Sequence, residues 1–443
     1  MVSPPHKTLF MDTRYKLRKL KNGITVLLID IPHSKIFRIE VAVNVGFIDE
    51  KNQNEFEHAH FWEHLQAAFP SSKYPGNTAR NTIANLGVST NASTSPDNTL
   101  FYVQGSSHDR EKITDIVLQS LVDYKHDPNT FEQERRAVLN EISANEDSVW
   151  LPLMHVIHRL QYSGMPMEHN LAQNRIKNVS KTAIKELLQW KQMHYVPERM
   201  VVCVAGDLGK DPELFIQKHV EPIIGKKTSF APKKYRIRDT VPPRSIAYKP
   251  HKINYVECPK ATQTSTVCLV FPHPYSSFDN QSYILQAIAF VLTHGLDCRL
   301  YETLRTKHGL IYSVHADIEK DMIHRGLFMI ETTVMKVQNV PTVVNLVLEE
   351  LKYFCKHSIP ELAKFHKTCD ISEHMAALNR VPARFVSQYS AGPIWDLPVV
   401  TYKEMFNKRR TVVTESNVLK VANKLFRPKN TFIFYGHSTK YSN

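Results

Sequence analysis

Apolar and polar residues alternate near the N-terminus in patterns that predict β-strands. Residues 15–20 and 24–29 are extended runs, and Asn22 and Gly23 lie between them. Asn-Gly between two such runs is a strong signal for a β-hairpin. Apolar and polar residues alternate from Ile36 to Gly46, where residues 39–45 read Ile-Glu-Val-Ala-Val-Asn-Val, and this alternation predicts a half-buried strand. We therefore expect the chain to open with part of a sheet.

Helical patterns follow these strands, and the same order returns in the second half of the chain. The first half closes with Pro197 and an apolar run that ends at Gly206, and the second half closes with Pro428 and a similar run that ends at Gly436. This repetition predicts an α+β protein with two homologous domains. In each domain we expect an α/β sandwich, with helices packed on a mixed, mostly antiparallel sheet.

The length and one basic stretch indicate where the two domains meet. A chain of 443 residues is long for a single domain. Residues 226–254 are basic and contain the pair Pro242 and Pro243, which is typical of an extended linker. We expect an N-terminal domain at 1–225, a linker at 226–254 and a C-terminal domain at 255–443.

The strongest chemical signal is the segment 57–64, which reads Glu-His-Ala-His-Phe-Trp-Glu-His. On a helix this spacing places His60, Glu63 and His64 on one face. Two neutral imidazoles at i and i+4 can hold one zinc ion, and a carboxylate just before the second can reach a water on that ion. The alternative is a surface helix that is merely rich in His and Glu. His58 points away from this face, and we expect it to be structural or solvated.

A second helical segment offers acidic side chains for such a metal. Residues 129–142 form a helical pattern that Asn129 or Thr130 is expected to cap. Glu134 and Glu141 are seven residues apart and therefore lie on one face. A catalytic zinc site needs a third protein ligand and an open position for water, so we look for that ligand on this helix.

In this combination the chain resembles the pitrilysin and insulysin family of zinc endopeptidases, in which H-x-x-E-H is followed by a helix with two glutamates seven apart. The resemblance implies that His60, His64 and Glu141 bind one Zn²⁺ per chain and that Glu134 orients a ligand. It also implies that Glu63 is the general base, and then the general acid, of a metalloendopeptidase. The rival interpretation is a non-catalytic scaffold or processing-partner subunit of the same fold.

Two positions beside the proposed ligands depart from the family pattern. The glycine that usually stands three residues before the first histidine is Glu57 here, and the segment at 65–69 also differs from the usual one. Both lie next to the ligands. They therefore bear on the width of the cleft and on the choice of substrate.

A polar segment that contains Asn91 and Ala92 precedes an extended run at 99–103. By composition alone it is a turn that leads into a strand. The resemblance implies instead an exposed edge to which a peptide substrate adds as an extra strand, held by main-chain hydrogen bonds. Asn91 and Ala92 are therefore candidates for substrate binding.

Arg305 and Tyr312 lie seven residues apart in the second half, on either side of Gly309. The pattern alone predicts a solvated helical arginine, a loop at the glycine and a tyrosine that opens a strand. The resemblance implies that Arg305 and Tyr312 lie over the zinc, where both can donate hydrogen bonds to the substrate carbonyl and stabilise its oxyanion.

The number of domains implies a partner chain. Long members of the resembled family form a closed clamshell of four such domains, with the zinc in the first and the arginine and tyrosine pair in the fourth. This chain has only two domains, half of the clamshell. We therefore expect a homodimer or a related second subunit, and Arg305 and Tyr312 could then act across the interface.

Charge and cysteine content bear on partners and location. The formal net charge is +13, but the lysines are scattered, which favours a solvated basic surface over a nucleic-acid partner.

The six cysteines form no Cys-x-x-Cys pair, which indicates a reducing compartment. No apolar run reaches the length of a membrane span, and the N-terminus has no targeting pattern. We expect no membrane partner and a cytoplasmic location.

Overall fold

The computed structural model describes most of the chain, and its contacts divide the chain into two compact units. The described residues are 13–146, 149–225, 244, 248–261, 264–320, 325–379 and 381–439. Unit 1 is drawn from Met1–Ile142, Ala172–Tyr235 and Ser372–Met405, and unit 2 from Ser143–Leu171, Arg236–Ile371 and Phe406–Asn443. Each unit thus combines segments that are far apart in the sequence. Most of the predicted linker at 226–254 lies outside the described residues, and the boundaries 1–225 and 255–443 stay a prediction.

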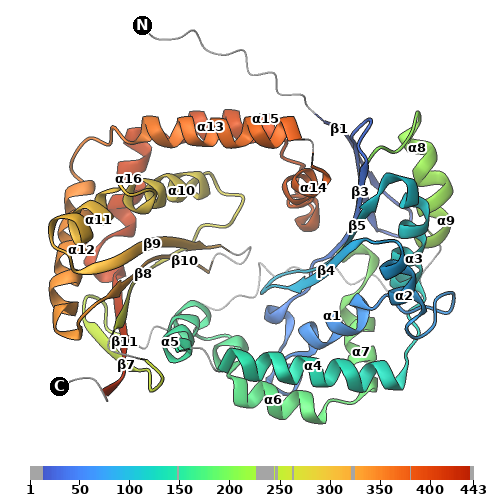
Figure 1. Ribbon diagram of the computed structural model, residues 1–443, viewed down its shortest axis with the longest axis horizontal. Coiled ribbons are helices and arrows are strands. Elements are labelled where there is room, and N and C mark those ends of the chain that lie inside the picture. The colour runs from blue at the N-terminus through green and yellow to red at the C-terminus, as the bar shows by residue number, and fades with distance from the viewer. Residues whose placement is uncertain are drawn as a thin grey trace, which may run out of the picture. The chain divides into compact units, whose positions relative to one another are not determined.

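Unit 1 is built on a six-stranded mixed sheet with the order β1-β2-β6-β3-β5-β4 (Figure 1). The strands are Arg14–Lys19 (β1), Thr25–Asp30 (β2), Ile36–Val43 (β3), Ser89–Thr94 (β4), Thr99–Ser106 (β5) and Met200–Gly206 (β6). Neighbouring strands are antiparallel except for β2 and β6, which are parallel. The β4 strand forms one edge of this sheet, and no strand of the described residues pairs with its outer side.

The first two strands form the predicted hairpin, whereas β3 is more buried than predicted. Gly23 has a φ of 106° in the hairpin turn, a conformation that glycine adopts without strain. The strand expected within 36–46 is present as β3, but the prediction that it is half-buried is wrong, because every residue of β3 after the first is buried. Arg38 donates to Glu40 at 2.6 Å and lies 3.6 Å from the centre of the Tyr102 ring. These charges can be buried because they have partners.

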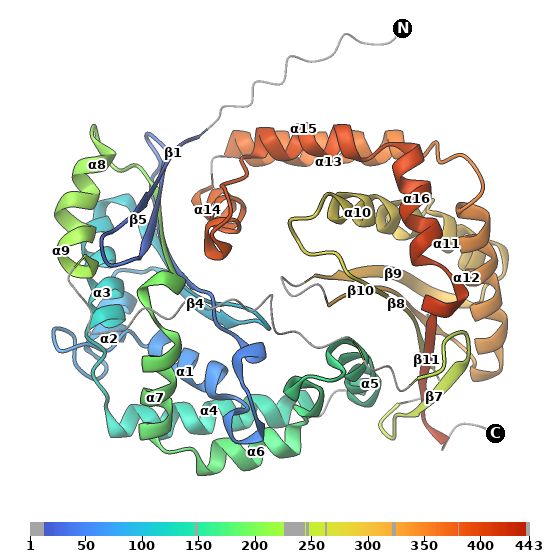
Figure 2. The same ribbon diagram turned by 180° about the vertical axis from the view of Figure 1, so that it is seen from behind.

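Helices pack on both faces of the unit 1 sheet (Figure 2). Ile39 of β3 points into a core that it shares with Trp62. Ala42 of the same strand points to the opposite face, into a core that it shares with Phe385 and Tyr389. The helices that lie mainly in this unit are His58–Ala67 (α1), Thr78–Asn85 (α2), Arg110–Val122 (α3), Pro128–Glu146 (α4), Ala172–Lys181 (α6), Ile184–His194 (α7), Pro212–Phe215 (α8), Glu221–Ile224 (α9) and Pro382–Ser390 (α14).

Unit 2 is built on a five-stranded mixed sheet with the order β7-β11-β8-β10-β9. Its strands are Ile253–Glu257 (β7), Ser265–His273 (β8), Ile311–Glu319 (β9), Gly326–Val334 (β10) and Phe432–His437 (β11). The core of one sheet face includes Leu153 and Leu160 of α5 (Leu151–Tyr162). The remaining helices of the second half are Asn280–Thr293 (α10), Arg299–Tyr301 (α11), Val340–Phe354 (α12), Leu362–Asn379 (α13), Tyr402–Val412 (α15) and Glu415–Leu425 (α16).

Five strands of the unit 1 sheet, all except β1, have the same topology as the five strands of the unit 2 sheet. The β7 and β11 strands are parallel and the other neighbours in unit 2 are antiparallel, so β7, β11, β8, β10 and β9 correspond to β2, β6, β3, β5 and β4. The final strand of each sheet follows a short 3₁₀ turn, at Pro197–Arg199 and at Pro428–Asn430. The predicted α+β fold, with helices packed on mixed sheets, is therefore confirmed.

A histidine is buried at the end of β8, and we expect it to make the stability of unit 2 depend on pH. His273 is 2% exposed, and burial, together with the charges of Arg244 and Lys320, lowers its pKa to about 4. A neutral histidine buried in this way stabilises the fold fully above its unfolded pKa of about 6.5 and loses that contribution as the pH falls toward 4. We expect a loss of roughly 3 kcal/mol over this range.

Urea unfolding of the wild type and of His273→Gln at pH 7 and pH 4.5 measures this contribution. The wild type should lose more stability on acidification than the variant, because the variant has no buried imidazole to protonate. His315→Gln is the control, since His315 is an exposed histidine of the same unit. Equal losses in the wild type and His273→Gln would contradict the prediction.

Candidate metal centre

The α1 helix presents the H-x-x-E-H motif beside β4 and α4. The Phe61 side chain is fully buried in the unit 1 core and stacks on Phe131 of α4, with the ring centres 5.4 Å apart. The polar face of α1 is thereby turned toward these neighbours. The Glu63 carboxylate accepts a hydrogen bond from the Thr94 hydroxyl of β4 at 3.2 Å, and His64 contacts α4 through its ring.

Three side chains bring their metal-binding atoms together. His60 Nε2 lies 3.2 Å from His64 Nε2 and 3.3 Å from Glu141 Oε2, and His64 Nε2 lies 3.4 Å from the same oxygen. Ligand atoms at about 2.0–2.1 Å from a tetrahedral zinc ion are about 3.3–3.4 Å apart, so these residues fit such an ion. Within the described residues this is the one group of three or more His, Cys, Asp or Glu side chains suited to a metal ion.

The cluster is open on one side. The side chains of His60 and His64 are 17% and 15% exposed, whereas that of Glu141 is 52% exposed. A catalytic metal site keeps a fourth position for water or substrate. The exposure of Glu141 leaves room for that position.

Both glutamates of α4 reach α1, as their spacing predicted. The predicted cap of this helix, Asn129 or Thr130, is wrong: the Asp127 carboxylate accepts the Thr130 N–H at 2.8 Å and its hydroxyl at 2.7 Å. Asp127 therefore fixes where α4 begins, and Pro128 is the first helical residue, a position that tolerates proline. From this start, Glu134 and Glu141 both face His64.

Glu134 joins His64 to an arginine. Its Oε2 lies 3.1 Å from His64 Nδ1, and its Oε1 accepts a hydrogen bond from Arg80 of α2 at 2.8 Å. Burial alone would raise the pKa of Glu134, but the hydrogen bonds from His64 and Arg80 hold that pKa below its ordinary value. Glu134 is therefore charged at neutral pH and can hold the His64 ring in one orientation.

A matching contact on His60 was not predicted from the sequence. The Glu57 Oε2 atom lies 2.8 Å from His60 Nδ1, and Oε1 accepts a hydrogen bond from Arg175 of α6 at 2.6 Å. The position of Glu57, three residues before His60 and in place of a glycine, was the one available signal. Arg80 and Arg175 are far from the motif in sequence, and their spacing carried no signal.

The Glu63 carboxyl is close to the metal ligands without contacting them. It is 7% exposed, and burial raises its pKa above the ordinary value, although nearby His60 and His64 partly oppose that shift. A carboxyl with a raised pKa is better able to take and return a proton near neutral pH. His58, in contrast, is 6% exposed with its ring against Trp190 at 5.8 Å, so it is a structural residue.

The proposed substrate-binding residues lie on the edge strand. Asn91 and Ala92 belong to β4, where they pair with Tyr102 and Phe101 of β5. The predicted turn before a strand is therefore itself a strand. The outer side of β4 keeps main-chain groups available in the part of the chain that the structure describes, and the contact between Glu63 and Thr94 ties this strand to α1.

Arg305 and Tyr312 come together in unit 2. Arg305 donates a hydrogen bond to the Tyr312 carbonyl, and its guanidinium lies 4.7 Å from the centre of the Tyr312 ring. Gly309, with a φ of 63°, turns the chain between them, and β9 begins at Ile311, one residue before the predicted start at Tyr312. The Tyr312 side chain is 66% exposed and is available to bind a ligand.

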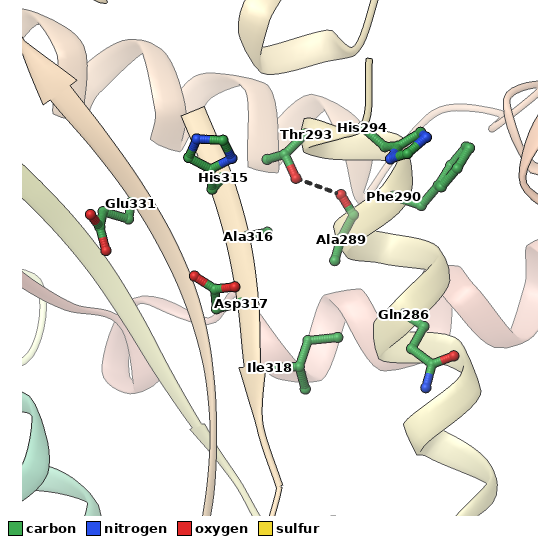
Figure 3. A pocket seen from close by; sticks show the side chains of 10 residues that line it. All are labelled: Gln286, Ala289, Phe290, Thr293, His294, His315, Ala316, Asp317, Ile318 and Glu331. Carbon is green, nitrogen blue, oxygen red and sulfur yellow. Dashed lines mark hydrogen bonds between the residues drawn. The ribbon is translucent and has the colours of Figure 1, made fainter. Parts of the chain in front are cut away.

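In unit 2, α10 and β9 correspond to α1 and β4 of unit 1. A hollow lies between them, and α10 does not carry the H-x-x-E-H motif. The hollow has a volume of about 470 Å³. Figure 3 shows the side chains that line it, between α10 and the edge strand β9. The α10 helix contributes Gln286 and Thr293, the residue that follows it contributes the His294 side chain, and the sheet contributes Asp317 and Glu331. Among the described residues these side chains form no metal-binding group. The duplication therefore preserved the fold but not the ligands.

Two family models match the chain. Residues 25–175 match the model of insulinase, peptidase family M16, and residues 183–364 match the model of the peptidase M16 inactive domain. The first match contains every residue of the metal cluster together with Glu57 and Arg175. The second contains Arg305 and Tyr312.

Known proteins that are similar in sequence include named enzymes and subunits of complexes. The chain is 28% identical to cytochrome b-c1 complex subunit 1 of Caenorhabditis elegans, over 53% of this chain and 51% of the relative. It is 26% identical to an uncharacterized zinc protease of Mycobacterium leprae, over 68% and 65%, and 27% identical to the mitochondrial-processing peptidase subunit beta of Neurospora crassa, over 52% and 50%. The matches thus span about half to two thirds of these relatives.

Solved structures share the fold over nearly the whole chain. A protease from Helicobacter pylori aligns with a TM-score of 0.78 at 16% identity and covers 96% of this chain and 99% of its own. Pitrilysin aligns with a TM-score of 0.74 at 19% identity, and the match covers 99% of this chain and 46% of pitrilysin. The resemblance seen in the sequence is confirmed: the chain belongs to peptidase family M16, the insulinase family.

Proposed function

We propose that this chain is a zinc-dependent endopeptidase that cleaves peptides or small unfolded proteins. The observation that carries the proposal is the cluster of His60, His64 and Glu141, whose ligand atoms lie 3.2–3.4 Å apart with Glu63 on the same helix. The zinc proteases of Mycobacterium leprae and Rickettsia felis among its relatives support it. A zinc ion bound there would lower the pKa of water toward about 7 and polarise the scissile carbonyl.

The protein side chains then account for the proton transfers. The Glu63 carboxylate takes one proton from the attacking water as the water oxygen bonds to the carbonyl carbon. The same carboxyl returns that proton to the amine nitrogen as the carbon–nitrogen bond breaks. Burial of Glu63, which raises its pKa, suits a group that must do both.

We assign substrate binding to main-chain groups of β4 and to Arg305 and Tyr312 of unit 2. An extended peptide would add to the edge at Asn91 and Ala92, a mode that tolerates varied side chains. Arg305 and Tyr312 would donate hydrogen bonds to the carbonyl oxygen as it gains negative charge. The pair could come from the same chain or from a second one.

The second candidate function is a non-catalytic scaffold subunit. It is favoured by the relatives named as cytochrome b-c1 complex subunits and by the inactive-domain model that matches residues 183–364. Against it, His60, His64 and Glu141 are all present with their atoms arranged for a metal, and Glu63 is beside them. An unused site has no physical reason to retain both the ligands and the base.

Cleavage of a mixed peptide library, read by mass spectrometry, tests the proposal. Cuts that disappear after treatment with a chelator and return when zinc is added would establish a zinc peptidase. The scaffold function would be favoured instead if the protein binds zinc stoichiometrically and cleaves no peptide, either alone or after a related subunit is added.

We also expect two chains in the active particle. Light scattering should give the mass of a homodimer, or of a complex with a related subunit. If Arg305 acts across the interface, mixing the inactive variants Glu63→Gln and Arg305→Ala should restore part of the activity, because one site in the mixed dimer is intact. A fully active particle with the mass of one chain would contradict this expectation.

Location and further partners stay predictions. No disulfide joins the six cysteines, all of which lie in the described part of the chain, and four of them are buried, which supports a reducing compartment such as the cytoplasm. None of the described helices combines the length and apolarity needed to cross a membrane. Mitochondrial proteins are among the relatives, so fractionation of cells that express a tagged full-length protein is the direct measurement. We expect no nucleic-acid partner.

A further inference from the structure

We propose that Glu57, held in place by Arg175, is a positioning residue for the metal ligand His60. The inference rests on the function proposed above, because it takes His60 to be a ligand. It assigns a role to a residue that stands where a glycine is usual, and to an arginine that lies 118 residues after it in the chain. The contacts that support it lie within unit 1.

The first support is the direction of the hydrogen bond. Glu57 has no proton to donate when it is charged, so the contact at 2.8 Å requires that His60 Nδ1 carries the proton. A neutral imidazole with its proton on Nδ1 has a free electron pair on Nε2. That nitrogen is the one that lies 3.2 Å from His64 Nε2 and 3.3 Å from Glu141 Oε2. Glu57 therefore selects the form of His60 that can bind a metal.

The second support is that Glu57 is buried and that both of its carboxylate oxygens have a hydrogen-bond partner. Its side chain is 1% exposed, and a buried carboxylate requires partners. One oxygen binds His60, and the other binds Arg175 at 2.6 Å. The neighbouring buried acid, Glu50, accepts the Ala59 N–H through its Oε1 at 3.1 Å.

The third support is the match with His64. His64 Nδ1 contacts Glu134, which accepts a hydrogen bond from Arg80. Each histidine of the motif thus contacts a glutamate through its Nδ1 atom, and each of these glutamates accepts a hydrogen bond from an arginine. The two arginines come from different helices, α2 and α6, so packing of the unit built the same arrangement twice.

The fourth support is the backbone of Glu57. It has a φ of 75° and a ψ of 2°, a left-handed conformation that glycine adopts freely and that residues with a Cβ adopt at a cost. Glu57 makes no side-chain cap to α1, so capping does not explain why this residue is tolerated here. Its contact with His60 does, since strained residues persist where they contribute to a site.

The test measures zinc affinity rather than catalysis. The dissociation constant for Zn²⁺ is determined by competition with a chromophoric chelator for the full-length wild type, Glu57→Gly and Glu57→Gln, and the melting temperature is measured without metal. We expect Glu57→Gly to weaken zinc binding by about 10- to 100-fold, the usual effect of losing a group that orients a ligand. Glu57→Gln should weaken binding less, since its amide oxygen can still accept from His60.

Two controls separate positioning from simple structural support. Glu132→Gln removes a carboxylate of α4 that pairs with Arg135 and contacts no ligand, and it should bind zinc like the wild type. In the Co²⁺-substituted protein, the visible absorption bands should shift in Glu57→Gly and stay unchanged in Glu132→Gln. A role confined to joining α1 and α6 would lower the melting temperature without moving these bands.

The outcomes are distinct. Wild-type zinc affinity and an unchanged Co²⁺ spectrum in Glu57→Gly would overturn the inference, whatever the melting temperature does. If Glu57→Gly does not fold, Glu57→Gln carries the test, and wild-type affinity in that variant together with an unshifted spectrum would likewise overturn it. A wild type that binds zinc and cleaves no peptide would overturn the proposed function and leave the role of Glu57 standing.

Discussion

Glu63→Gln should abolish peptide turnover while the metal stays bound. Glutamine has the size of glutamate and can keep the hydrogen bond from Thr94, but its amide cannot take a proton from water. Loss of a general acid–base group lowers the rate by about 100- to 10,000-fold. Glu63 is not among the three residues whose ligand atoms meet, so zinc affinity should be close to that of the wild type. The measurements are kcat/KM on a peptide substrate and zinc content after dialysis.

The control for this prediction is Glu132→Gln, which makes the same chemical change at an exposed position of α4. It should retain both turnover and zinc. Normal kcat/KM in Glu63→Gln would remove Glu63 from the mechanism. Loss of zinc in that variant would instead mean that Glu63 supports the ligands.

A fragment of residues 1–235 should fail to reach the native state of unit 1. Unit 1 includes Ser372–Met405, and Phe385, Val386 and Tyr389 of α14 bury one face of its sheet, against Leu27, Ala42, Val201 and Cys203. Each buried apolar side chain contributes about 1.5–3 kcal/mol. The three from α14 together approach the whole stability of an ordinary domain, about 5–15 kcal/mol.

Circular dichroism and binding of a hydrophobic dye measure this effect. The fragment should melt without a cooperative transition and should bind the dye through the uncovered sheet face. Adding a peptide of residues 381–405 should restore part of the cooperative transition, whereas the same peptide with Phe385→Asp and Tyr389→Asp should not. A fragment that melts cooperatively at the temperature of the full chain would show that α14 is dispensable.

Local patterns predicted much of the fold and the candidate site. The hairpin follows from Asn22 and Gly23, because the conformation of a short hairpin loop depends on the loop residues themselves: the Gly23 N–H donates to the Leu20 carbonyl at 3.0 Å and closes the turn. The shared faces of His60, Glu63 and His64 on α1, and of Glu134 and Glu141 on α4, follow from the period of the helix. The similar endings of the two halves predicted a duplication, which the matching strand orders bear out.

Other features depended on packing between segments that are distant in the sequence. Periodicity indicated that β3 had an apolar face, but the burial of its other face depends on α14, more than three hundred residues later. The pairing of Arg38 with Glu40 at 2.6 Å then allowed charged residues on that face. A pattern within one strand carries no information about the element that will cover it.

The sequence by itself determined the chemistry that the protein can offer: two histidines and a glutamate on one face of one helix, and two glutamates seven residues apart on one face of another. Only the tertiary structure decided how these groups are held. The stacking of Phe61 on Phe131 brings α4 to α1, and α2 and α6 supply Arg80 and Arg175. The physical reason is that periodicity specifies the face on which a side chain lies, whereas its partner is specified by the packing of the whole unit.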